Sequence, residues 1–89
     1  MINKMAGYMT KLGLAVTGIE DYLDENQISY KSAGSTLSFN TDENMNINKI
    51  KDDIDDIVVE SFGCKKASKR RKYTFLENMI FIRFKKEVH

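Results

Sequence analysis

The sequence predicts an α+β fold of two αββ-like units, with helices packed on one face of a small antiparallel sheet of four or five strands. Two observations predict the elements. Apolar residues recur at helical spacing in two segments, and apolar and polar residues alternate in the segments that follow them. A faint internal repeat of helix followed by hairpin predicts their order. Eighty-nine residues are expected to form a single domain, residues 1–89.

The N-terminal segment has the spacing of an amphipathic helix, because its apolar residues follow one another in steps of three and four. They are Ile2, Met5, Met9, Leu12, Val16, Ile19 and Leu23. Its three glycines weaken the prediction, since each costs about 1 kcal/mol relative to alanine inside a helix. The capping-box pattern from Thr17 to Glu20 indicates a new helix start. We therefore expect a break at residues 13–17, a separate helix within 1–16 and a firm helix over 18–26; one bent helix is the alternative.

Residues 27–40 alternate between apolar and polar side chains, as half-buried strands do. Ala33-Gly34-Ser35 supplies a turn, so this segment is predicted to be a β-hairpin that completes a helix-plus-hairpin unit over residues 17–40. A tight turn at this place puts Tyr30 opposite Phe39 on the buried face, which is a favourable cross-strand pair.

A second helix is predicted over residues 46–62 and ends at Gly63, a residue type typical of helix C-termini. The polar segment before it, Thr41 to Asn46, suits a loop and an N-cap. The apolar stripe of this helix consists of Ile47, Ile50, Ile54, Ile57, Val58 and Phe62. On or beside the opposite face, where we expect a solvated helix surface, lie Asp52, Asp53, Asp55 and Asp56.

Residues 64–86 are predicted to form basic antiparallel strands. KYTFLE, a turn at Glu77-Asn78 and MIFIRFKK give the strongest strand signal in the chain. Through this turn, the register puts four residues on the core face: Tyr73, Phe75, Ile80 and Ile82. The opposite face then carries the facing pairs Lys72–Arg83 and Thr74–Phe81. Residues 64–68 are predicted as one further short strand, with residues 69–71 as its turn.

No constellation of catalytic residues is recognised, so the protein is not expected to be an enzyme. The only histidine, His89, is the last residue, and chain ends tend to be mobile. The only cysteine, Cys64, provides neither a disulfide framework nor a cysteine-rich zinc site, and the acidic run lacks the loop geometry of a calcium site. We therefore expect no cofactor and no metal. No apolar run approaches the ~20 residues of a membrane span, and the low cysteine content suits the cytoplasm.

The net charge of +1 conceals a strong asymmetry along the chain. Residues 17–60 carry eleven acidic and three basic side chains, whereas residues 61–89 carry nine basic and two acidic ones. Such a polarity indicates a charged partner. Like charges that face each other on neighbouring strands are destabilising, and a bound phosphate would relieve that cost. An aromatic side chain beside cations on a sheet can also stack on unpaired bases.

These features predict a nucleic-acid-binding protein. RNA or single strands are favoured over duplex DNA, because acidic helices would repel the phosphates that border a major groove. The candidate binding residues are Lys65, Lys66, Lys69, Arg70, Arg71, Lys72, Phe81, Arg83, Lys85 and Lys86. The competing interpretation is that these cations only keep an edge strand and a loop in solution.

The segment GCKKASKRRKYTFLENMIFIRFKK places a helix-ending Gly-Cys-Lys before basic strands. In this element order, residues 41–86 resemble the double-wing DNA-binding domain of the T4-type phage middle transcription activator. No specific motif supports the likeness, so no residue role is transferred. In size, composition and style the chain resembles the small accessory proteins of T4-like phages, many of which bind RNA or host proteins. This resemblance implies a phage or mobile-element origin and a place in the host cytoplasm. The abundant Lys, Ile and Asn have AT-rich codons, which indicates an AT-rich genome such as many phages, mobile elements or Firmicutes have.

Two other hypotheses remain open. The protein could be an inhibitor of a host factor, such as a counter-defence or anti-toxin protein that acts on an RNA–protein complex, and would then use its acidic helices or its N-terminal segment. It could also form a homodimer through the heptad-like stripe from Ile2 to Leu23, although such a stripe is more often the core face of a single helix.

Overall fold

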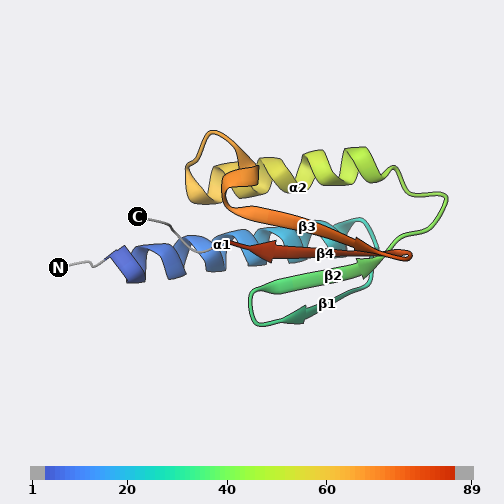
Figure 1. Ribbon diagram of the computed structural model, residues 1–89, viewed down its shortest axis with the longest axis horizontal. Coiled ribbons are helices and arrows are strands. Elements are labelled where there is room, and N and C mark those ends of the chain that lie inside the picture. Colours follow the sequence, from blue (N-terminus) through green and yellow to red (C-terminus); the bar gives the residue numbers. More distant parts are fainter. Residues whose placement is uncertain (1–3, 86–89) are drawn as a thin grey trace.

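The computed structural model describes residues 4–85, with side chains from Gly7 onward (Figure 1). Two helices and two hairpins alternate along the chain in the order αββαββ. The elements are α1 (Lys4–Glu25), β1 (Tyr30–Ala33), β2 (Thr36–Asn40), α2 (Ile47–Phe62), a 3₁₀ helix (Ala67–Lys69), β3 (Arg71–Leu76) and β4 (Met79–Phe84). The predicted fold class is confirmed, with four strands among the described residues.

The four strands form one antiparallel sheet in the order β1-β2-β4-β3, so that the second strands of the two hairpins pair in the middle. The predicted registers are confirmed, because Tyr30 faces Phe39 and Lys72 faces Arg83. Both hairpin turns place their first residue in the left-handed region, Gly34 at φ 61° and Glu77 at φ 55°. Such backbone geometry matches the twist of paired strands in two-residue turns.

The sheet has two different faces, because successive side chains on a strand point to opposite sides. Both helices cover one of them, which we call the inner face (Figure 1). The inner face carries Tyr30, Ser32, Leu37, Phe39, Arg71, Tyr73, Phe75, Ile80, Ile82 and Phe84. The other, called the outer face here, carries Lys31, Ala33, Thr36, Ser38, Asn40, Lys72, Thr74, Leu76, Met79, Phe81 and Arg83.

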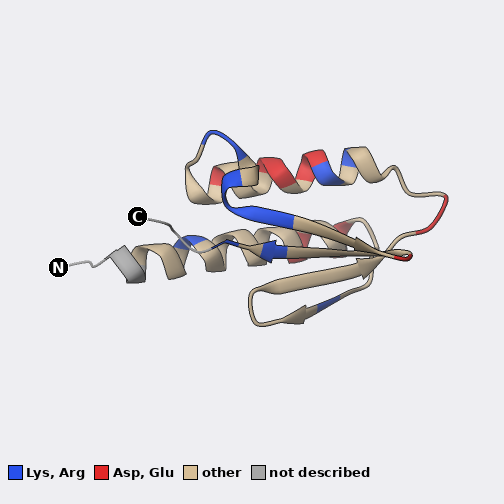
Figure 2. Cartoon of the chain, in the orientation of Figure 1, with Lys and Arg blue, Asp and Glu red and all other residues tan. Residues whose placement is uncertain are grey.

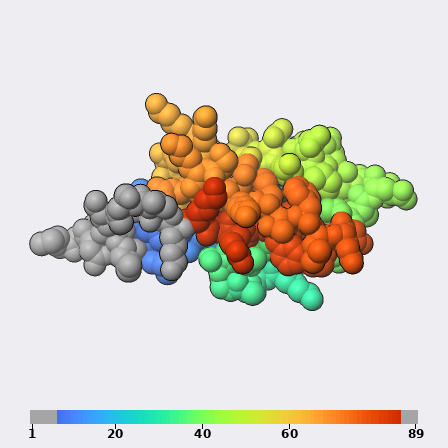
Figure 3. All heavy atoms as spheres, in the orientation of Figure 1, coloured from blue at the N-terminus to red at the C-terminus, as the bar shows by residue number. Residues whose placement is uncertain are grey.

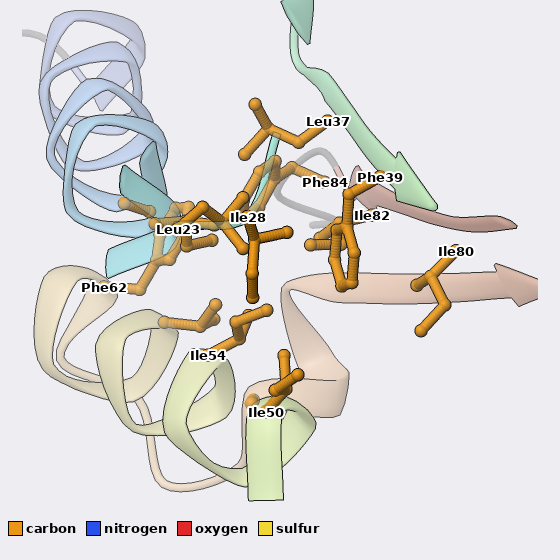
Figure 4. Close-up of a cluster of buried hydrophobic side chains, with 14 residues drawn as sticks. Leu23, Ile28, Leu37, Phe39, Ile50, Ile54, Phe62, Ile80, Ile82 and Phe84 are labelled. Atoms are coloured by element: carbon orange, nitrogen blue, oxygen red, sulfur yellow. The ribbon is translucent and has the colours of Figure 1, made fainter. Parts of the chain in front are cut away.

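The hydrophobic core lies between the inner face and the two helices (Figure 4). Leu23 from α1, Ile54 from α2 and Ile82 from β4 are fully buried. Burial of one such side chain contributes roughly 1.5–3 kcal/mol to stability. Phe75 departs from the prediction: it is on the inner face, but it remains 56% exposed because β3 is an edge strand.

Helix α1 runs without a break from Lys4 to Glu25, so the predicted break at residues 13–17 and the capping box at Thr17 are wrong. The core-facing residues Ala15, Ile19 and Leu23 are all fully buried, and this packing outweighs the low helix propensity of the glycines. Gly18 serves the packing directly: a Cβ atom there would lie 2.8 Å from Cγ2 of Ile57 on α2. The predicted stripe residue Ile2 lies outside the described residues.

Helix α2 has the predicted ends. The side chain of Asn46 accepts a hydrogen bond from the backbone N–H of Lys49 at 3.1 Å, which caps the N-terminus. Gly63 adopts the left-handed conformation at φ 67°, and its N–H donates to the carbonyl of Val59.

The segment after α2 differs from the prediction, because residues 64–68 do not form a strand. Ala67 is buried at 6% exposure and starts a 3₁₀ helix that ends at Lys69. The N–H of Arg70 donates to the carbonyl of Ala67 at 2.8 Å. The backbone of this segment thus forms hydrogen bonds within the segment rather than with a neighbouring strand. β3 therefore remains an edge strand.

Candidate nucleic-acid interface

The predicted basic stretch runs from the loop after α2 into β3 (Figure 2), and the alternation of β3 divides its side chains between two faces. Arg71 pairs with Phe84 and belongs to the inner face, whereas Lys72 pairs with Arg83 and belongs to the outer face. Two adjacent cations thus point to opposite sides of the sheet. The side chains that were predicted as one cluster must be considered separately.

Arg71 is bound to α2. Its Nε and Nη2 atoms donate to the two carboxylate oxygens of Asp55, both at 2.7 Å, and the hydroxyl of Tyr73 donates to Oδ1 of Asp55 at 2.7 Å. The guanidinium also lies 4.2 Å from the centre of the Tyr73 ring. A bidentate pair with a stacked aromatic fixes the guanidinium in one orientation. These contacts therefore attach β3 to α2. We call the three residues that form them, Arg71, Asp55 and Tyr73, the Asp55 clamp.

The clamp changes the acid–base properties of its members. Burial raises the pKa of the Asp55 carboxyl, but the hydrogen bonds from Arg71 and Tyr73 outweigh this effect, so that its pKa lies below the usual value. Burial, together with the hydrogen bond to Asp55, raises the pKa of the Tyr73 hydroxyl. Asp55 is therefore a carboxylate and Tyr73 a neutral donor across the ordinary pH range.

A second aspartate of the same run makes an equivalent attachment to α1. The Tyr22 hydroxyl donates to Oδ2 of Asp53 at 2.7 Å, and Nζ of Lys49 lies 2.8 Å from the same oxygen. Burial and this hydrogen bond raise the pKa of Tyr22 to about 12. The interpretation as a solvated surface is thus wrong for Asp53 and Asp55. The sequence did not reveal the contacts of these two aspartates, because the acidic run alone does not show which sides of α2 pack against α1 and β3.

Two other candidate cations, Arg70 and Lys85, have different surroundings. The guanidinium of Arg70 lies 5.5 Å from the centre of the Phe62 ring, on the helical side. The ammonium of Lys85 donates to the carbonyl of Ser68 at 2.8 Å, and Lys86 lies outside the described residues.

The remaining lysines lie in the segment between α2 and β3 (Figure 2), and all of them are exposed to solvent. They are Lys65, Lys66 and Lys69. Within residues 4–85, their side chains form no hydrogen bond or ion pair. We call them the loop cations.

The outer face is organised in rows that cross the strands. In one row Lys72 and Arg83 face each other on β3 and β4, with Thr36 beyond them on β2. In the next row Phe81, half-buried on the central strand β4, lies between Thr74 on β3 and Ser38 on β2. At the far end of the hairpin, the apolar residues Leu76 and Met79 form a third row with the polar Asn40 on β2.

The outer face is cationic, and the acids lie elsewhere. Its charged residues are Lys31, Lys72 and Arg83, and no acid belongs to the registers that define it. The exposed acids of α1 and α2 lie in the helical layer: Asp21, Asp24, Glu25, Asp52, Asp56 and Glu60. In the space-filling view, residues of β3 and β4 occupy the middle of the visible surface, between α2 and the β1–β2 hairpin (Figure 3).

Neither a metal centre nor a membrane-spanning helix is found in the part of the chain that the structure describes. Residues 4–85 contain no group of three or more His, Cys, Asp or Glu side chains arranged to hold a metal ion. No helix within the same residues combines the length and hydropathy that crossing a bilayer requires.

The fold and this surface define a class of small αββαββ protein with an acidic helical layer and an open, cationic sheet face. The chain has no significant match to a protein-family model, a curated protein or a solved structure.

Proposed function

We propose that this protein binds nucleic acid, with RNA or single strands favoured over duplex DNA. It would act as a small non-enzymatic accessory or regulatory protein of phage or mobile-element origin in the host cytoplasm. The observation that carries the proposal is the pair Lys72 and Arg83, which face each other on an open sheet surface. Neither side chain has a hydrogen-bonding or ionic partner among the described residues.

Electrostatics favours an anionic ligand at this pair. Like charges directly opposite each other on neighbouring strands are destabilising, and a phosphate between them converts that repulsion into attraction. The loop cations extend the positive potential beyond the start of β3. Phosphate binding by several lysines and arginines releases counterions, which makes the affinity strongly dependent on salt.

Phe81 favours unpaired over paired bases. Its ring is on a central strand and on the sheet face opposite the two helices, next to the cationic row. Single-stranded RNA is often held in this manner, with bases stacked on sheet aromatics and phosphates bound by neighbouring cations. In a duplex the bases are already stacked on one another and cannot reach such a ring.

The helices do not suit duplex recognition. Asp52, Asp56 and Glu60 are exposed on α2, and a helix with such a surface would be repelled by the phosphates on both sides of a major groove. The same charges disfavour contact between nucleic acid and the helical layer. We therefore propose one-sided binding on the outer face and the loop cations, with Arg71 as a positioning residue that fixes β3.

The test is a fluorescence anisotropy titration with a labelled unstructured RNA, the same sequence as single-stranded DNA, and a DNA duplex. Replacement of Lys72 and Arg83 by Glu should weaken single-strand binding by about tenfold or more. The matched control is Lys11→Glu, the same change on the exposed surface of α1, which should have little effect. Phe81→Ala should cost a further ~5- to 150-fold for unpaired bases only.

Two results would contradict the proposal: equal binding at low and high salt, or unchanged binding after the charge reversals. The alternative of a protein-binding inhibitor would be supported by capture of a host protein that persists after nuclease treatment. That capture should then be lost when Asp52 and Asp56 are replaced by lysine, and kept when Lys72 and Arg83 are replaced by Glu.

A further inference from the structure

A hollow of about 310 Å³ is lined by residues of the β1–β2 hairpin and by the first residue of β4, Met79. The residues that line it include Ser29, Lys31, Ser38, Asn40 and Met79. Four of the lining residues, Lys31, Ser38, Asn40 and Met79, belong to the outer face, and two, Tyr30 and Phe39, belong to the inner face at the same edge of the sheet. Most of the lining is therefore on the outer face. Ser38 is the direct neighbour of Phe81 across the β2–β4 pairing.

The polar side chains of this hollow are free to bind a ligand. Lys31, Ser38 and Asn40 make no side-chain hydrogen bond or ion pair with any residue that the structure describes. An amide can donate and accept, a hydroxyl can do both, and the ammonium of Lys31 supplies a positive charge. No acid lines the hollow. These groups match a polar, anionic ligand better than an apolar one.

The position of the hollow relates it to the cationic row. Lys31, Ser38, Phe81 and Thr74 form one continuous row across all four strands. Adjacent strands are ~4.8 Å apart, so β3 and β1 are separated by roughly 14 Å. Four-stranded sheets that bind RNA stack two or three bases over such a width.

We propose that the hollow is a subsite for the unpaired nucleotide next to the one that stacks on Phe81. Asn40 and Ser38 hydrogen-bond the polar groups of this nucleotide, and Lys31 binds its phosphate. The strand of nucleic acid thus crosses the sheet from the Lys72–Arg83 pair to β1. This inference rests on the proposed function. Beside the stacking position at Phe81, it adds a position at which the ligand is read by hydrogen bonds.

Two other hollows suit a nucleotide less well. One of about 380 Å³ is lined in part by Asp42, and one of about 390 Å³ is lined in part by Asp24. Each places a carboxylate where a phosphate would have to approach, and neither is lined by outer-face residues.

Two substitutions with matched controls test the subsite. Lys31→Met removes a cation from the hollow, and Lys11→Met makes the same change on α1. Asn40→Leu removes the amide, and Asn48→Leu makes the same change at an exposed position of α2. Affinity for short unstructured RNA, and for DNA of the same sequence, is measured as a function of salt, with circular dichroism to verify that every variant is folded.

We expect Lys31→Met to reduce the slope of log affinity against log salt by about 0.7, the value for one phosphate of a single strand. Asn40→Leu should weaken RNA binding about fivefold, as expected for the loss of one hydrogen bond. If the amide reads the ribose 2′-hydroxyl, the loss is confined to RNA. If it reads a base edge, the loss is equal for RNA and DNA but differs among homopolymers.

The subsite is overturned if Lys31→Met and Asn40→Leu bind as their controls do while the Lys72 and Arg83 reversals still abolish binding. In that case the proposed function stands without it. If the wild-type protein binds no oligonucleotide in a salt-dependent manner, the proposed function and the subsite are both overturned.

Discussion

The two faces of the β3–β4 hairpin use the same residue types for opposite purposes. On the inner face, Arg71 is held by Asp55 through two hydrogen bonds of 2.7 Å and covers the ring of Tyr73. On the outer face, the next residue, Lys72, faces Arg83 and has no partner within residues 4–85. One cation stabilises the fold, while the other is available to a ligand.

The difference shows that a run of charges in a strand is not a unit. Alternation assigns each member to one face, and the neighbours on that face determine what the charge does. A test of function based on the entire run would combine loss of folding with loss of binding. Variants that separate adjacent residues avoid this problem.

The largest expected difference in the free energy of unfolding is between alanine variants of Ile82 and Phe81. Ile82 is fully buried on the inner face, so Ile82→Ala should lower the free energy of unfolding by about 2–5 kcal/mol. Phe81 is on the outer face, and its replacement by Ala should cost much less stability. Urea denaturation of both variants measures the difference. A similar loss at the two positions would show that Phe81 belongs to the core rather than to a binding surface.

The next largest difference is between Arg71 and Lys72. Arg71→Ala removes charge-assisted hydrogen bonds from half-buried partners and should lower the free energy of unfolding by about 1–3 kcal/mol. Lys72→Ala should leave stability nearly unchanged and weaken nucleic-acid binding. Thermal unfolding and anisotropy on the same two proteins give both readouts. If Arg71→Ala is as stable as the wild type, the Asp55 clamp is not a structural element.

The Asp55 clamp should also make stability depend on pH. The pKa of Asp55 is lowered on folding, so its contribution is fully present above the unfolded value of ~3.9 and is lost as the pH falls through the lower folded value. Urea midpoints measured between pH 7 and pH 2 should therefore decline at the acidic end, and Asp55→Asn should reduce this decline. The control is Asp56→Asn at an exposed position of α2, which should leave the profile as it is.

The smallest effect of an inner-face substitution on stability is expected at Phe75, where the inner face is nearly as exposed as the outer face. This residue points to the inner face but is 56% exposed, and its ring lies 5.3 Å from the ammonium of Lys51. Phe75→Ala should cost about 1 kcal/mol or less, the scale of an exposed cation–π contact. A cost near that of Ile82→Ala, measured in the same urea series, would mean that the edge of the sheet is more tightly covered than its exposure indicates.

Periodicity in the sequence predicted most of the fold. Alternation and turn position were sufficient for the pairs Tyr30–Phe39 and Lys72–Arg83, because register in a hairpin follows from its turn. A single helix α1 was predicted only as the alternative to two helices, since its stability comes from packing of Ala15 and Ile19 that local propensity does not contain. The 3₁₀ helix after α2 was missed because burial of Ala67 depends on the assembled core.

The candidate site could be predicted only in part. The register already placed Lys72, Arg83 and Phe81 on one face. It also implied that Arg71 lies on the other, but the partner of Arg71 depends on how α2 crosses β3. The hollow at Ser38 and Asn40 is lined by residues of two hairpins that are separated in the sequence, so no local sequence pattern predicts it.

The central pairing of β2 with β4 gives the chain an approximate two-fold axis perpendicular to the sheet. In the strand registers, an offset of 43 residues relates the pair Tyr30–Phe39 to the pair Tyr73–Ile82. Under this symmetry Ser38 corresponds to Phe81, Asn40 to Arg83 and Ser29 to Lys72. The positions that carry an aromatic ring and two cations in one half therefore carry small, uncharged hydrogen-bonding groups in the other. At a fourth position the difference is reversed, because Lys31 in the β1–β2 half corresponds to Thr74 in the β3–β4 half. Two halves of one architecture thus place their cations at different positions of the same surface.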